Sequence, residues 1–121
     1  MSLEKLNLND LTGYYNNEKL IRETVTQIQK DFGEFSFEIN FSGDRGTPYE
    51  ELLNEMKPII EGLISSHSKA FIPLLYRIDM SESEVRNCLM EMNSDGIEKL
   101  VEAIIKRELK KVLIRHYFKS R

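Results

Sequence analysis

The chain has 121 residues, of which 40% are hydrophobic and 31% charged, with six glycines and three prolines. This profile fits one globular domain with its own core and excludes an intrinsically disordered chain. The single cysteine, Cys88, excludes an internal disulfide, and no cysteine or histidine pair has the short spacing of a zinc site. Because no apolar run is long enough to span a membrane and the N-terminal residues are polar, we expect a cytoplasmic protein without a signal peptide.

Apolar spacing predicts a mainly α fold, a single-domain orthogonal bundle of five helices over residues 17–121, after a loosely ordered lead-in over residues 1–16. Thr47, followed by Pro48 and Glu50, is typical of a helix start, and Ser81 with Glu84 is a second capping box. Pro58 predicts a kink, and residues 66–68 read as a joint between two helices. The predicted helices lie at about 17–32, 48–66, 70–78, 82–92 and 95–118, and the apolar third one is expected at the centre of the core.

Residues 34–42 form the one convincing strand-like insertion. Phe35, Phe37, Ile39 and Phe41 alternate with polar residues, the period-two pattern of a half-buried strand. A lone strand needs a hydrogen-bonding partner. Three solutions exist. The partner is a short strand elsewhere in the chain, or it is the same segment of a second copy, or the segment packs in an irregular extended form without a partner strand. We favour the second copy, which makes these four residues the predicted homodimer interface.

The candidate chemistry is sparse, and we predict no catalytic residues, metal ligands or cofactor. His67, His116 and Cys88 are interpreted as structural residues. The loop over residues 42–48 (SGDRGTP) resembles an anion-binding approach to a helix N-terminus. It lacks the lysine arrangement of a P-loop, however, and Asp44 would repel phosphate.

Residues 74–79 (LLYRID) attach polar groups to a very apolar helix. A half-buried Arg77 needs a carboxylate, and Asp79, Glu82 and Glu84 are close in sequence, so we predict a structural ion pair between Arg77 and Asp79. A polar binding site at this junction is the alternative. In this segment and in residues 106–112 (KRELKKV), the chain resembles a family of small uncharacterised helical bacterial proteins without an assigned activity. The resemblance covers roughly residues 48–118 and implies a helical fold and a bacterial cytoplasmic protein.

Charge is concentrated at the C-terminus. Residues 106–121 hold seven basic residues and one acidic residue, whereas residues 1–105 hold ten basic and nineteen acidic residues. This asymmetry is typical either of a helix C-terminus or of a basic surface for nucleic acid. The basic face of the last helix is predicted to contain Arg107, Lys110, Lys111, Arg115 and Lys119. We therefore expect a non-enzymatic helical protein-interaction module acting as a homodimer, with an unknown protein partner, and a nucleic-acid-associated protein as the alternative.

Overall fold

The computed structural model describes residue 8, residues 10–90 and residues 94–119. Within these residues the chain forms four α-helices and two short 3-10 helices, and no strand is present there. The predicted mainly α fold is therefore confirmed. The described residues form four α-helices where five were predicted, and the predicted strand insertion is not among them. The elements are η2 (Thr12–Tyr14), α1 (Glu18–Asp31), η3 (Gly33–Phe35), α2 (Pro48–Arg77), α3 (Glu82–Met90) and α4 (Ser94–Lys119). No helix in the described ranges is long and apolar enough to cross a membrane.

The helices begin where local capping chemistry predicts. The Asn17 side chain accepts a hydrogen bond from the Leu20 backbone N–H and opens α1. Thr47 Oγ1 accepts from the Glu50 N–H at 3.2 Å, and Ser81 Oγ accepts from the Glu84 N–H at 3.1 Å. Each cap satisfies one N–H that the first helical turn leaves without a partner.

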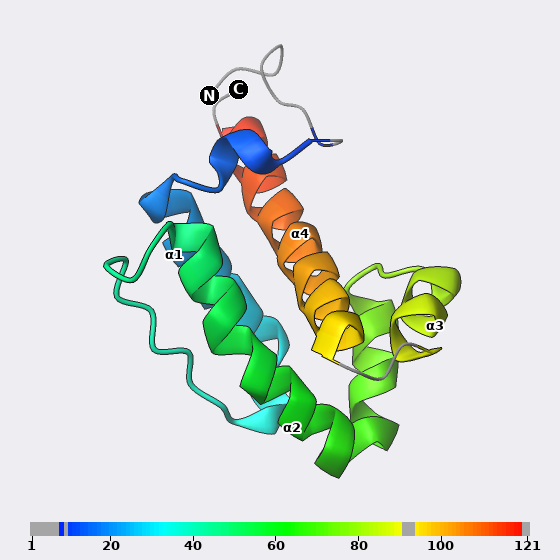
Figure 1. The fold of residues 1–121 in the computed structure, drawn as a ribbon. Helices are drawn as coiled ribbons and strands as arrows, with labels where there is room; N and C mark the ends of the chain where they lie inside the picture. The colour runs from blue at the N-terminus through cyan, green and yellow to red at the C-terminus, as the bar shows by residue number, and fades with distance from the viewer. Residues whose placement is uncertain (1–7, 9, 91–93, 120–121) are drawn as a thin grey trace.

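The second and third predicted helices are the two parts of one element, α2. The predicted joint is present as a break in helical geometry at His67, which has φ −138° and ψ 31°. Figure 1 shows α2 bending sharply at its lower end before the chain continues to α3. Pro58 and Pro73 both lie in parts of α2 with helical dihedral angles, so the break falls at the joint and not at the predicted kink near Pro58.

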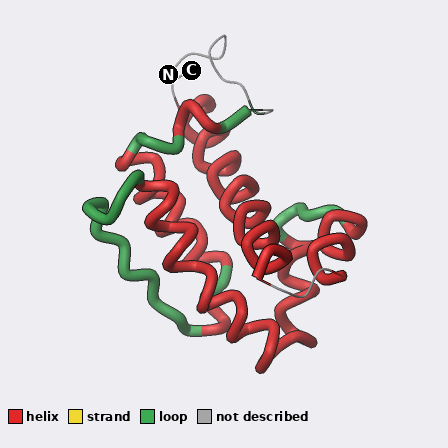
Figure 2. The backbone as a smooth tube through the Cα atoms, viewed as in Figure 1, coloured by secondary structure: helices red, strands yellow, loops and turns green. Residues whose placement is uncertain are grey.

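Residues 36–42 have no regular secondary structure, which corrects the predicted strand. Figure 2 shows this part of the chain as a loop that runs along the outside of the helices from η3 back to the start of α2. Ile39 is buried in the core, and Phe37 packs edge-to-face on Phe32 with ring centroids 6.0 Å apart. The alternation of apolar and polar residues thus places one side of an irregular extended segment on the core, without a ladder of backbone hydrogen bonds.

The centre of the core is α4, which Figure 1 shows between α1, α2 and α3. Its side chains are buried along most of its length, whereas the predicted central helix, residues 70–78, is the last part of α2 and lies at one end of the bundle. The most deeply buried residues of α4, each with at most 1% exposure, are Leu100, Val101, Ile104, Ile105, Glu108, Leu109, Val112 and Leu113.

The lead-in packs on the bundle over the part that the structure describes, residue 8 and residues 10–16. Leu11 is buried, and the Tyr15 ring stacks on Tyr49 of α2 with centroids 3.8 Å apart. The Tyr49 N–H also donates to the Tyr15 carbonyl at 3.1 Å. These residues therefore add to the core, whereas the prediction left residues 1–16 as a loosely ordered segment; residues 1–7 and 9 lie outside the described ranges.

Candidate functional site

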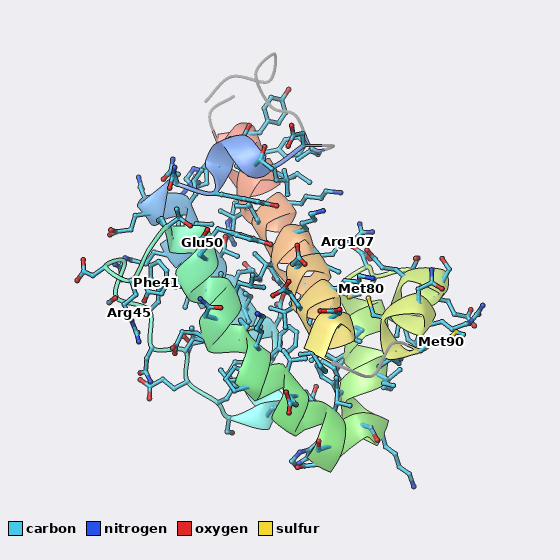
Figure 3. All side chains as sticks on the ribbon, viewed as in Figure 1. Phe41, Arg45, Glu50, Met80, Met90 and Arg107 are labelled. Carbon is cyan, nitrogen blue, oxygen red and sulfur yellow. The ribbon has the colours of Figure 1, made fainter. Side chains whose placement is uncertain are left out.

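An apolar groove of about 320 Å³ lies between the last turns of α2 and the short helix α3. We call it the α2–α3 groove. Two of the four large hydrophobic side chains that the described residues expose line this groove, namely Tyr76 at 45% and Met90 at 77%. Figure 3 shows Met90 at the outer end of α3, away from the bundle. The lining residues are Ile72, Tyr76, Glu82, Val85, Arg86, Leu89 and Met90.

The polar rim of the groove carries one charge of each sign. Glu82 and Arg86 are one helical turn apart on α3, and Arg86 Nη2 lies 3.1 Å from Glu82 Oε1. Both side chains are strongly exposed, so this ion pair stabilises the isolated helix only weakly. Both charges therefore remain open to solvent at the edge of the groove.

The four residues predicted to form a dimer interface contact their own chain. Ile39 is buried, while Phe35, Phe37 and Phe41 are half-buried and pack against the core. Phe35 lies edge-to-face against the ring of Phe71, at 6.2 Å between centroids. The Arg22 guanidinium lies over the Phe41 ring, 5.1 Å from its centroid. Of the alternatives for this segment, the geometry favours irregular packing within the chain.

The predicted basic face of α4 contacts acidic and polar groups of the same chain. Lys111 Nζ lies 2.6 Å from Asp31 Oδ2 of α1, and Arg107 Nη2 lies 3.5 Å from Glu84 Oε1 of α3. Arg115 donates to Gln27 Oε1 at 3.0 Å. Lys110 is half-buried and Lys119 is exposed at the end of α4. Two of the five predicted cations, Arg107 and Lys111, thus face carboxylates of the same chain.

A carboxyl cluster lies beneath this face, at the contact of α1 with α4. Glu108 is fully buried, and neither of its oxygens has a hydrogen-bond partner within the described residues. Burial raises the pKa of Glu108, and the adjoining Asp31 carboxylate raises it further, to about 8. Burial also acts to raise the pKa of Asp31, but bonds from Lys111 and Gln27 outweigh it and lower that pKa. Glu108 thus keeps its proton at neutral pH while Asp31 is ionised.

A second buried carboxylate, Glu51, organises the loop before α2. The N–H groups of Ser42 and Gly43 donate to its two oxygens at 2.6 and 2.9 Å, and that of Arg45 donates at 3.2 Å. Burial acts to raise the pKa of Glu51, but these bonds outweigh it and lower the pKa to about 2. The loop that resembles an anion-binding approach does bind an anion, which is the side chain of its own following helix.

The predicted ion pair of Arg77 with Asp79 is not formed. Arg77 Nη2 instead lies 2.6 Å from Glu34 Oε1 of η3, and Asp79 adopts a left-handed backbone conformation with φ 70° in the turn that follows α2. That turn directs the chain into α3, so the two side chains of the LLYRID segment serve different contacts. Arg77 still ties the end of α2 to another element, as a structural ion pair would.

The remaining candidates occupy structural positions. His67 contacts Phe35 edge-to-face at 5.9 Å between centroids, and Cys88 is buried. His116 Nε2 lies 2.5 Å from Glu23 Oε2 across the α1–α4 contact. Across residue 8, residues 10–90 and residues 94–119, no group of three or more histidine, cysteine, aspartate or glutamate side chains is arranged to hold a metal ion.

Comparison with family models, with curated proteins and with solved structures finds no match for this chain. The resemblance of residues 74–79 and 106–112 to small helical bacterial proteins therefore stays a prediction. The strongest candidate for a functional surface is the α2–α3 groove. The support for it is the exposure of Tyr76 and Met90 along its lining.

Proposed function

We propose that the protein is a non-enzymatic helical interaction module that forms a homodimer through the α2–α3 groove. The observation that carries the proposal is the clustering of exposed Tyr76 and Met90 on one apolar groove, at 45% and 77% exposure. Contiguous exposed apolar surface of this kind marks interaction sites on soluble proteins. Leaving it in water is unfavourable, at roughly 25 cal/mol for each Å² of apolar surface.

The rim of the groove supports a second copy of the chain as the occupant. In a twofold dimer each residue of the patch meets the same patch on the partner. If two α3 helices pack antiparallel across such an axis, Glu82 of each copy faces Arg86 of the other. One acidic and one basic residue separated by one turn make this surface self-complementary.

The two other surfaces that the sequence suggested, the Phe35–Phe41 segment and the basic face of α4, are less suited to binding a partner. The Phe35–Phe41 side chains are engaged with the core, so the proposed interface lies elsewhere than the sequence indicates. A nucleic-acid surface needs cations that are available to phosphates. Lys111 and Arg115 of the basic face instead contact Asp31 and Gln27 of the same chain.

The proposed dimer is small and therefore weak. A nine-residue helix is only about 13 Å long, so the interface lies at the low end of the size range for stable complexes. We expect a dissociation constant in roughly the micromolar range.

Charge reversal tests the self-complementary rim by sedimentation equilibrium. Glu82→Arg and Arg86→Glu each place like charges against one another at two symmetric contacts, so each variant alone should weaken the dimer about tenfold or more. The double variant restores opposite charges and should regain most of the association. Failure of the double variant to associate better than either single variant would contradict antiparallel α3 pairing.

A further inference from the structure

A second hollow, of about 300 Å³, lies between the lead-in and α4, and we call it the lead-in cleft. Three parts of the chain line it: the described part of the lead-in (residue 8 and residues 10–15), Glu84 of α3, and the middle of α4. Figure 3 shows Arg107 on α4 at the side that faces α3. The lining residues are Leu8, Asp10, Leu11, Thr12, Tyr15, Glu84, Ala103, Lys106, Arg107 and Lys110.

Three cations from a little over one turn of α4 converge on this cleft: Lys106, Arg107 and Lys110. Neither lysine forms an ion pair within the ranges that the structure describes. Arg107 reaches Glu84 at 3.5 Å, well beyond the 2.7–2.9 Å typical of a strong charge-assisted hydrogen bond. The cleft thus holds cationic groups that make no short charge-assisted hydrogen bond to the described residues.

The two carboxylates of the cleft differ in the hydrogen bonds that they accept. Asp10 Oδ1 already accepts bonds from the Thr12 N–H at 3.1 Å and the Thr12 hydroxyl at 2.7 Å. Glu84 Oε1 is buried, yet it has no hydrogen-bond partner within the described residues. A buried carboxylate oxygen that accepts no hydrogen bond is costly, and the nearest cation, Arg107, is 3.5 Å away. This atom is therefore suited to accept a hydrogen bond from a hydroxyl group of a bound molecule.

We propose that the lead-in cleft binds a small phosphate ester that also carries a hydroxyl group. The lysines and Arg107 match the charge and geometry of a phosphate group, and Glu84 Oε1 matches a hydroxyl donor. The volume is at the lower end of the range for small-molecule sites. Carboxylates on two sides of the cleft would repel a polyanion, which favours a small ester over a nucleic acid. This inference does not rest on the dimer, because no residue lines both the lead-in cleft and the α2–α3 groove.

Isothermal titration calorimetry with glycerol 3-phosphate, inorganic phosphate and glycerol tests the proposal. The ester should bind more tightly than phosphate, and glycerol alone should not bind. Lys110→Ala should weaken binding of the ester about tenfold, because one charge-assisted contact is lost. Lys119→Ala is the matched control, since it removes the same charge from the exposed end of the same helix and should leave the affinity unchanged.

Glu84→Gln separates the two halves of the site. The variant should lower the ratio of ester affinity to phosphate affinity, because the charged acceptor for the hydroxyl is replaced by a neutral and weaker one. Unchanged helicity and melting temperature show that each variant is folded. The proposal is overturned if the ester does not bind, if phosphate binds as tightly as the ester, or if Lys110→Ala and Lys119→Ala weaken binding equally.

Discussion

Glu51 is the residue on which the loop before α2 depends. Its two oxygens accept hydrogen bonds from three backbone N–H groups that would otherwise be without partners in a loop. Local sequence rules identified the loop and the helix start after it. They did not identify the carboxylate, because an acidic residue in the first turn of a helix is ordinary and its direction depends on how the loop folds over it.

The folded state should lose stability in acid through Glu51. Its pKa is about 2 in the folded protein and ordinarily 4.5, so the unfolded chain takes up a proton first as the pH falls. This contribution is complete above pH 4.5 and is lost between pH 4.5 and 2. Glu51→Gln should lower the melting temperature at pH 7 and flatten its decline across that window.

Thermal denaturation from pH 2 to pH 7 measures the effect of Glu51→Gln. Glu50→Gln is the control, since it makes the same change at the exposed neighbouring position. Equal pH profiles for the two variants would show that the buried carboxylate is not the group that titrates.

Glu108 should act with the opposite sign. Its pKa in the folded state is about 8, so between pH 4.5 and 8 the folded protein keeps a proton that the unfolded chain releases. The free energy of unfolding should therefore fall as the pH rises through this window, by up to about 1.4 kcal/mol per pH unit from this group. Glu108→Gln removes the titration and should be more stable than the parent at pH 8.

Urea denaturation at pH 5 and pH 8 compares Glu108→Gln with the parent chain. Glu102→Gln, at a half-buried position on the same helix, serves as the control. A stability difference between Glu108→Gln and the parent that is the same at both pH values would exclude a proton held at the α1–α4 contact.

At the scale of elements, helix starts follow from neighbouring residues and packing partners do not. Asn17, Thr47 and Ser81 each cap a helix through a residue three positions away. The sequence predicted two of these helix starts, at Thr47 and Ser81. The contacts of Arg77 with Glu34 and of Lys111 with Asp31 join residues 43 and 80 positions apart. A single sequence carries no local signal for such distant pairs. The basic face of the last helix was therefore predicted without its acidic partners.

The segment over residues 36–42 shows that an alternation of apolar and polar residues is compatible with two structures, a strand in a sheet and an irregular extended segment. Alternation shows that one side of an extended chain is buried, but it does not show whether a neighbouring strand supplies hydrogen bonds. Here the buried side meets the core of the same chain through Ile39 and Phe37.

Ile39→Ala should therefore destabilise the isolated chain. Removing a buried isoleucine side chain leaves a cavity and should lower the free energy of unfolding by about 2–4 kcal/mol. Glu38→Ala, at the exposed neighbouring position, should change it by only about 0.5 kcal/mol. Chemical denaturation measures both. A loss at Ile39 no larger than that at Glu38 would show that the segment does not contribute to the core.

At the scale of the whole molecule, most of the core lies away from the surface that we propose for dimerisation. The α1, α2 and α4 helices bury the carboxyl cluster and most of the apolar side chains between them, and α3 lies at one end (Figure 1). Exposed Tyr76 and Met90 lie where α3 meets the end of α2, whereas Val85, which also lines the groove, belongs to the core.

The most direct test is the mass of the protein over concentrations from about 1 µM to about 1 mM, a range chosen to bracket a micromolar dissociation constant. Met90→Glu and Phe118→Glu form a matched pair, because both replace strongly exposed hydrophobic residues, at 77% and 62% exposure, and only Met90 lines the groove. We predict that the parent chain and Phe118→Glu dimerise with the same dissociation constant, while Met90→Glu stays monomeric. A parent chain that is monomeric throughout, or a Met90→Glu variant that dimerises as the parent does, would contradict the proposed interface.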